Sequence, residues 1–221
     1  MRNTTTSEII SKIKENKIIA IIRNVSEEKL IPLCQALYDG GIRLVEVTYS
    51  ANGKVSDEKT AAQIKMLASN FQGKLYIGAG TVITQKQVVY TAKSGGQFII
   101  SPNTDKKVIK TTKRMGLVSI PGALTPSEAL SAKQYGADFV KLFPINNLGV
   151  DYFKAVSAPL SHIDFLAVGG ISPENMEGYL NSNISGFGIG SNIIDKKLID
   201  ANDWAAITKL AQSYTVVFKI G

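Results

Sequence analysis

The chain is poor in the residues that mark disulfide-bonded, metal-binding or membrane-spanning proteins. It has 1 cysteine and 1 histidine among 221 residues. A single cysteine excludes an internal disulfide, and His162 has no Cys/His cluster near it, so we expect no metal site and a cytoplasmic protein. No stretch approaches the roughly 20 consecutive apolar residues that a membrane span needs, and residues 1–16 lack the apolar core of a signal peptide. We therefore expect no membrane partner.

The charge balance is basic, with 25 Lys and Arg against 18 Asp and Glu, a net charge of +7. The lysines are spread over nearly every expected helix face, and no RNP, zinc-knuckle or helix-turn-helix pattern occurs. The composition therefore predicts no nucleic-acid partner. A positive field of this kind can gather small anionic substrates.

Short apolar runs alternate with helical patterns along the whole chain. The runs are rich in Ile, Val and Leu, as is typical of parallel strands that are buried on both faces. The expected strands are 18–22, 44–48, 75–79, 98–101, 118–120, 139–142, 165–168 and 186–189.

The segments between the runs repeat their apolar residues every 3.6 positions. The plainest case is Leu30, Leu33, Cys34 and Leu37, after the expected N-cap Ser26, where Cys34 is expected to be a packed apolar residue. Ile9, Ile10 and Ile13 indicate an additional helix before the first strand.

Eight strands, each followed by a helix at a mean spacing of about 24 residues, predict a (β/α)8 TIM barrel with an extra N-terminal helix. We expect residues 1–221 to form this single domain. An open doubly wound sheet is the alternative, but its glycine-rich turn belongs after the first strand, and here the glycine-rich elements come late.

Two charged residues interrupt these apolar strands. Lys141 lies in the run 139–144, where every other side chain is apolar. Burial favours the neutral amine, which is a nucleophile toward a carbonyl carbon, although a strand-edge lysine that reaches solvent fits the same pattern. Glu46 is equally unusual in Val45-Glu46-Val47, where it fits either a proton-transferring carboxyl group or a structural ion pair with a lysine.

In such barrels the active site lies at the carboxyl ends of the strands. Arg23 ends the first strand, where its guanidinium fits either a substrate carboxylate or a surface salt bridge. Distinctive turns follow other strands: Gly78-Ala79-Gly80-Thr81, Ser101-Pro102-Asn103 and Pro121-Gly122. The seventh and eighth strands end in Gly169-Gly170 and Gly190-Ser191, the usual place of a phosphate site in this fold. Simple tight turns are the alternative reading of these glycines.

The combination of motifs resembles the 2-keto-3-deoxy-6-phosphogluconate (KDPG) / 4-hydroxy-2-oxoglutarate (KHG) aldolase family, including its 6-phosphogalactonate branch. The resemblance covers residues 18–194. It rests on Gly40-Gly41-Ile42 leading to Glu46, on Gly78-Ala79-Gly80-Thr81, Ser101-Pro102, Pro121-Gly122 and Lys141-Leu142-Phe143-Pro144, and on the segment from Gly169 to Asn175.

The resemblance implies roles for individual residues. Lys141 matches the Schiff-base lysine, Glu46 the general acid/base, Thr81 the threonine at the pyruvyl end, and Pro102 a pocket-lining proline. Gly169, Gly170 and Ser191 match the phosphate cradle, to which Gly190 is adjacent. The family is commonly trimeric and needs no metal or organic cofactor, so we expect a homotrimer that acts on a small phosphorylated keto acid.

Two positions depart from the gluconate-type pattern. Ser50 stands where those enzymes have an arginine that holds the substrate carboxylate, and Arg23 is the candidate replacement, as in the galactonate-type branch. Val168 stands where they tend to have threonine, which leaves the preferred C4 epimer open.

The implied reaction is class I aldol cleavage of a 2-keto-3-deoxy-6-phospho sugar acid to pyruvate and glyceraldehyde 3-phosphate. A related substrate is 4-hydroxy-2-oxoglutarate, which gives pyruvate and glyoxylate. A sugar-phosphate isomerase or epimerase that uses Glu46 without an imine, and a non-catalytic sugar-phosphate binder, are the alternatives from other classes.

Overall fold

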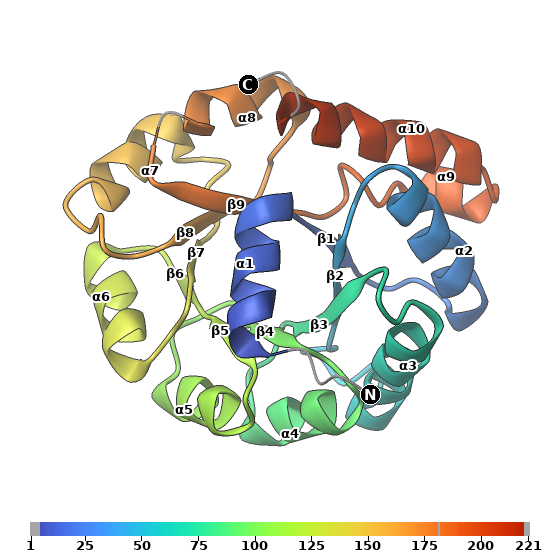
Figure 1. The fold of residues 1–221 in the computed structure, drawn as a ribbon, viewed down its shortest axis with the longest axis horizontal. Helices are drawn as coiled ribbons and strands as arrows, with labels where there is room; N and C mark the ends of the chain where they lie inside the picture. Colours follow the sequence, from blue (N-terminus) through green and yellow to red (C-terminus); the bar gives the residue numbers. More distant parts are fainter. Residues whose placement is uncertain (1–4, 181, 219–221) are drawn as a thin grey trace.

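The computed structural model describes residues 5–180 and 182–218, in which parallel strands form a ring inside a layer of helices (Figure 1). The strands are β1 (Ile18–Ile22), β2 (Leu44–Thr48), β3 (Tyr76–Gly80), β4 (Phe98–Ile100), β5 (Val118–Ile120), β6 (Gly122–Ala123), β7 (Val140–Leu142), β8 (Phe165–Val168) and β9 (Ile184–Ile189). The helices are α1 (Thr6–Asn16), α2 (Glu27–Asp39), α3 (Asp57–Asn70), α4 (Gln85–Lys93), α5 (Lys106–Arg114), α6 (Pro126–Tyr135), α7 (Gly149–Ser157), α8 (Pro173–Leu180), α9 (Lys196–Asp200) and α10 (Trp204–Thr215), followed by the 3-10 turn η1 (Val216–Phe218).

The strands follow the order β5-β4-β3-β2-β1-β9-β8-β7-β6, and every pair is parallel. Only Pro121 separates β5, which pairs with β4, from β6, which pairs with β7. These two short strands are therefore one barrel segment, broken at a residue that has no N–H to donate to the ladder. The expected TIM barrel is confirmed, and β6 is the one strand that the apolar runs did not predict.

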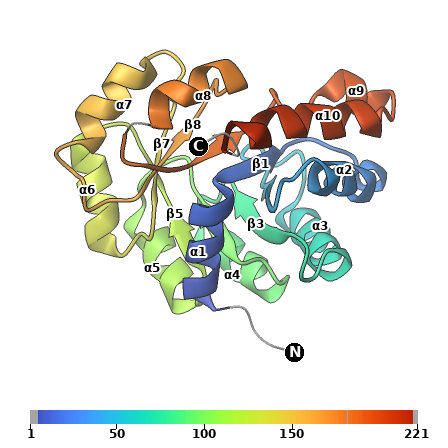
Figure 2. The same cartoon turned by 45° about the horizontal axis from the view of Figure 1, so that its top comes forward.

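Helix α1 closes the amino-terminal end of the barrel. Ile9 and Ile13 are buried in one cluster with residues such as Ile19 on β1 and Phe98 on β4. In Figure 1 this helix crosses the middle of the ring, and the tilted view of Figure 2 shows it lying across the strands. The expected additional helix is thus confirmed, and its buried face fills the end of the barrel that lies opposite the expected active site.

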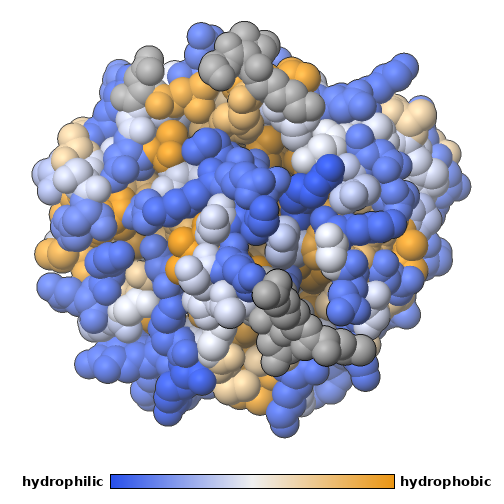
Figure 3. Space-filling view, in the orientation of Figure 1, coloured by the Kyte–Doolittle hydropathy of each residue, from blue (hydrophilic) through white to orange (hydrophobic). Residues whose placement is uncertain are grey.

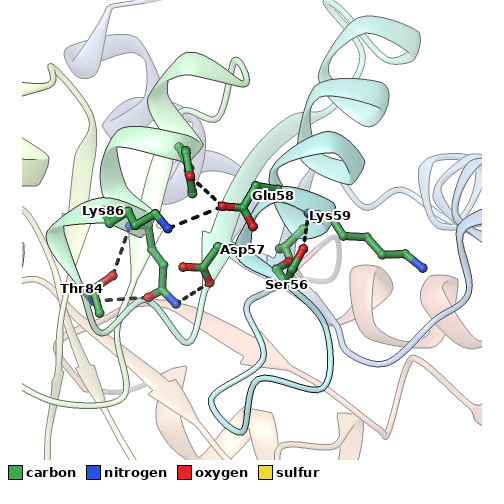
Figure 4. A network of polar contacts seen from close by, with 9 residues as sticks. Ser56, Asp57, Glu58, Lys59, Thr84 and Lys86 are labelled. Carbon is green, nitrogen blue, oxygen red and sulfur yellow. Dashed lines mark hydrogen bonds and ion pairs between the residues drawn. The ribbon is translucent and has the colours of Figure 1, made fainter.

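A polar network joins helices α3 and α4 outside the barrel (Figure 4). Glu58 accepts hydrogen bonds from the Tyr90 hydroxyl at 2.7 Å and from Lys86 at 3.5 Å, and Gln87 donates to Asp57 at 2.9 Å. The hydrogen bond from the Tyr90 hydroxyl makes the largest contribution to lowering the pKa of Glu58, which falls to about 2. These contacts fix α4 beside α3 and so position the loops that follow β2 and β3.

Cys34 is buried on α2, as predicted, and burial raises the pKa of its thiol. No helix within the described residues is long and apolar enough to cross a membrane.

Candidate active site

Glu46 and Lys141 point into the barrel. Leu44 on β2 and Phe139 before β7 belong to the cluster that fills the barrel interior. Side chains alternate along a strand, so the residues two positions later, Glu46 and Lys141, face the same interior. Glu46 is 2% exposed and Lys141 is 8% exposed. The strand-edge reading of Lys141 is therefore wrong: its side chain does not extend into solvent.

Burial shifts both groups toward their neutral forms. It raises the pKa of Glu46, against the opposing effect of the positive charges of Lys141 and Arg23. It lowers the pKa of Lys141, an effect that the Arg23 charge reinforces and the Glu46 charge opposes. Each group thus acts electrostatically on the other, and the site favours a neutral amine beside a protonatable carboxyl group.

The Glu46 carboxyl group is incompletely satisfied. Its Oε2 atom is buried and has no hydrogen-bond partner among the described residues. A buried acceptor without a partner costs about 1–3 kcal/mol, so a purely structural role explains this residue poorly. Unsatisfied, strongly shifted groups of this kind concentrate at functional sites.

Glycines allow close packing around the site. A Cβ atom at Gly80, the last residue of β3, would lie 1.4 Å from Oε1 of Glu46. Gly122 is the register partner of Lys141, and a Cβ there would lie 2.4 Å from the carbonyl oxygen of Pro102. Pro102 thus packs against the strand that pairs with Lys141.

The two residues expected to hold a carboxylate lie together at the carboxyl ends of β1 and β3. Nη2 of Arg23 donates to Oγ1 of Thr81 at 3.4 Å. Thr81 has a φ of 55°, a conformation that is unfavourable for a β-branched residue. Ser50, at the place of the missing arginine, donates to Asn52 at 2.8 Å. Arg23 is therefore the cation that the structure places beside Thr81.

A cavity of about 700 Å³ opens at the carboxyl ends of β1, β8 and β9. Gly169, Gly170, Gly190 and Ser191, the residues expected to hold a phosphate, all line it. Gly169 and Gly170 have φ values of 109° and 64°, which glycine alone adopts at little cost.

Two asparagines shape the rim of this cavity. Asn192 Nδ2 donates to the carbonyl oxygen of Ile171 at 2.8 Å, which ties the loop after β9 to the loop after β8. Asn175 donates to the carbonyl oxygen of Gly170 at 2.8 Å. The two glycine turns are therefore held in one arrangement across neighbouring strands.

The cavity adjoins the buried pair through Phe143. Phe143 lines the cavity, and its ring centroid lies 4.4 Å from Nζ of Lys141. Arg23 and Val168 also line it, whereas Glu46, Lys141, Thr81 and Pro102 are not among its lining residues. The structure thus separates a buried interior that holds Glu46 and Lys141 from a wider, glycine-lined mouth.

Five polar residues of this cavity escaped the sequence analysis: Asn24, Lys29, Asn192, Lys196 and Asp200. Lys29 and Lys196 lie on helices that begin just beyond the ends of β1 and β9. This position in the sequence could have indicated that both lysines lie near the mouth of the barrel. Within the described residues, no group of three or more His, Cys, Asp or Glu side chains is arranged to hold a metal ion.

A closed barrel that encloses an amine biased toward its neutral form, beside a protonatable carboxyl group and a glycine-lined mouth, has the features of a class I aldolase. The model of one family, the KDPG and KHG aldolases, matches residues 9–210. Among curated relatives, a 2-dehydro-3-deoxy-phosphogluconate aldolase of Haemophilus influenzae is 32% identical over 97% of this chain and 99% of its own. A 2-dehydro-3-deoxy-6-phosphogalactonate aldolase of Escherichia coli is 33% identical over 80% of this chain and 83% of its own.

Solved structures agree with the family match. A KDPG aldolase from Legionella pneumophila, with pyruvate captured as a covalent carbinolamine intermediate, is 29% identical with a TM-score of 0.83, covering 96% of this chain and 98% of its own. A native KDPGal structure is 30% identical with a TM-score of 0.81, covering 91% of this chain and 94% of its own. The chain belongs to the KDPG and KHG aldolase family. It is accordingly a class I aldolase, a carbon–carbon lyase.

Proposed function

We propose that the protein cleaves a 2-keto-3-deoxy-6-phospho sugar acid to pyruvate and glyceraldehyde 3-phosphate. The observation that carries the proposal is the pair of buried groups, a lysine with a lowered pKa and a carboxyl group with a raised pKa, inside one barrel. Relatives of both the phosphogluconate and the phosphogalactonate type match most of the chain, which supports this class of substrate.

In the proposed mechanism the neutral Lys141 amine attacks the C2 ketone and forms an iminium ion with loss of water. Glu46, directly or through water, removes the proton of the C4 hydroxyl group. The C3–C4 bond then breaks, its electron pair moves toward the iminium nitrogen, and glyceraldehyde 3-phosphate leaves. The remaining enamine is protonated at C3, and hydrolysis of the imine releases pyruvate and restores the amine.

The mouth of the barrel is proposed to hold the two ends of the substrate. Arg23 and Thr81, which are hydrogen bonded to each other, anchor the carboxylate. Pro102 borders the pyruvyl end. Gly169, Gly170, Gly190 and Ser191 hold the phosphate in the 700 Å³ cavity.

Arg23 supplies a cation near Thr81 while Ser50 supplies none, and this arrangement matches the galactonate-type branch that the sequence resembles. Val168, with no hydroxyl group at the mouth, favours the same branch. A second candidate substrate is 4-hydroxy-2-oxoglutarate. It is supported by the similarity to a KHG/KDPG aldolase of Escherichia coli, which is 32% identical over 96% of both chains. We further propose a single-domain, cytoplasmic homotrimer, which its single cysteine and its family membership support.

The test is a parallel assay of pyruvate release from both phosphorylated C4 epimers and from 4-hydroxy-2-oxoglutarate. We expect turnover of a phosphorylated epimer, with the galactonate type favoured. Lys141→Ala should lower turnover by roughly 10³-fold or more while the circular dichroism spectrum stays native. Incubation with pyruvate and borohydride should add mass irreversibly at Lys141. A protein that turns over sugar phosphates without gaining this mass is an isomerase, and one with no turnover at all is a binding protein; either result overturns the proposal.

A further inference from the structure

Helix α5 carries an uneven share of the positive charge. Its sequence, Lys106 to Arg114, contains four lysines and an arginine in nine residues. The sequence predicted lysines spread over nearly every helix face. On α5, however, the four lysines and the arginine all face one groove. Hydrophilic residues cover this part of the surface, at the lower left of Figure 3. The groove is lined by Gln85, Lys106, Lys107, Lys110, Lys113, Arg114, Tyr135 and Gly136, and we name it the α5 groove.

Four of the five cations lack a carboxylate partner. Lys113 forms an ion pair with Asp138 at 2.6 Å. Lys106, Lys107, Lys110 and Arg114 form no ion pair with any described residue. Arg114 donates to Thr111 at 2.9 Å, and Lys106 lies 5.4 Å from the centroid of the Tyr135 ring. Four positive charges therefore face one concavity without compensation.

The first-turn lysines oppose the helix dipole beside the N-cap Asp105, whereas Lys113 and Arg114 in the last turn are favourably placed. Lys110 lies three or four residues from Lys106, Lys107, Lys113 and Arg114, and like charges at these spacings repel. Lys106 and Lys107 also occupy the first turn, which holds no acidic residue and where the helix dipole favours anions. A bound anion would relieve both effects, since it would stand close to all of these side chains.

The groove has the size of a small-molecule site. Its volume is about 860 Å³, within the range of ordinary ligand pockets. The cations extend along roughly 12 Å of helix, and lysine side chains are long enough to converge on one ligand. A nucleic acid would need a longer surface, because such complexes usually make about 6–10 phosphate contacts. The shape therefore favours a compact anion.

We propose that the α5 groove binds a small anion with two or more linked phosphate groups, such as a nucleoside triphosphate or inorganic pyrophosphate. A single phosphate group carries about two negative charges at most, which would leave about half of the four unpaired cations uncompensated. Linked phosphates supply the missing charge within one compact molecule. This site is independent of the proposed aldolase function, because none of its lining residues borders the cavity at the barrel mouth.

The test is calorimetric titration of the full chain with ATP, pyrophosphate, inorganic phosphate and a 20-base-pair DNA duplex at low salt. The test variant is Lys107→Gln/Lys110→Gln, which keeps good helix formers in place. The matched control is Lys154→Gln/Lys209→Gln, which removes the same charge from exposed positions on α7 and α10. Any phosphate binding at the barrel mouth is common to all three proteins and cancels in the comparison.

We expect the affinity for ATP and pyrophosphate to fall at least tenfold in the α5 variant and to stay unchanged in the control. Inorganic phosphate should show no such difference. Binding of ATP and pyrophosphate with the same dependence on the α5 lysines would identify the linked phosphates as the recognised group. Aldolase kcat and KM should match the wild type in both variants, and thermal unfolding confirms that each is folded. Equal affinities in both variants, or α5-dependent binding of the DNA duplex alone, would overturn the proposal.

Discussion

The carboxyl group of Glu46 occupies the space that a side chain at Gly80 would fill, with only 1.4 Å between Oε1 and the position of a Cβ atom. Glu46 lies on β2 and Gly80 on the neighbouring β3, so the two strands share this space by pairing in register. The absence of a side chain at Gly80 thus determines where the carboxyl group of Glu46 can lie.

Gly80→Ala should lower kcat by roughly 10²-fold, because the added methyl group displaces the Glu46 carboxyl group from its place. Overpacking should also cost about 1–3 kcal/mol of stability. Steady-state kinetics and urea denaturation measure the two effects. Gly73→Ala is the control: its φ of 76° disfavours alanine, but a Cβ there meets nothing within 4 Å. We expect Gly73→Ala to lose stability and keep its kcat; an unchanged kcat in Gly80→Ala would contradict the proposed role of Glu46.

In the proposed mechanism Lys141 reacts as the neutral amine, so the rate of imine trapping with pyruvate and borohydride should rise with pH. Because the pKa of Lys141 is lowered, the rate should level off below pH 10.5, the ordinary pKa of lysine. The Glu46 charge raises this pKa, so in Glu46→Gln the midpoint should move to lower pH. The Arg23 charge lowers it, so in Arg23→Ala the midpoint should move to higher pH. Mass spectrometry of the trapped adduct over a pH series measures each midpoint. The exposed Lys209→Ala should leave the midpoint unchanged, and shifts of the opposite sign would contradict the assigned electrostatics.

Val168→Thr should shift substrate preference toward the phosphogluconate epimer by roughly tenfold, because it adds a hydroxyl group at the cavity wall that can bind the C4 hydroxyl group. The ratio of kcat/KM for the two epimers measures the shift. Val168→Ala, which removes volume without adding a donor, separates the hydrogen bond from the change in size. A ratio that changes equally in both variants would show that volume sets the preference.

Asn192→Ala should raise KM for the phosphorylated substrate by roughly tenfold and leave kcat nearly unchanged, because the lost hydrogen bond to Ile171 loosens the two glycine loops. Pyruvate trapping at Lys141 should be unaffected, since pyruvate carries no phosphate. A parallel loss of trapping would mean that Asn192 acts on the reacting centre instead.

Much of the fold was predictable because its signals are local. The strands β1, β2, β5 and β8 begin and end where their apolar runs do, since both faces of each strand are buried. The two-residue strand β6 was missed because Gly122 and Ala123 carry almost no apolar signal, and it exists only through pairing with β7. The apolar neighbours of Glu46 and Lys141 marked both as unusual, but they left a strand-edge lysine open, and only the barrel shows that both side chains face the interior.

The remaining parts of the site depend on contacts between distant segments. Lys29 and Lys196 look like ordinary surface lysines in sequence, and the closed ring brings both to one cavity. The five cations of α5 escaped notice because Lys106, Lys110 and Arg114 are separated by apolar residues and threonines, and their common face appears only once the helix forms. The hydrogen bond between Arg23 and Thr81 joins residues 58 positions apart.

Glu46 and Lys141, the side chains proposed to react, come from β2 and β7. On the ring these strands are separated by β1, β9 and β8 in one direction and by β3 to β6 in the other. Neither can move without rearranging a continuous ladder of backbone hydrogen bonds, whereas Arg23, Ser50, Val168 and Ser191 lie at strand ends or in loops. Under the proposed function, residues at the rim can therefore be exchanged to change the sugar acid that is bound without disturbing the strands that carry Glu46 and Lys141.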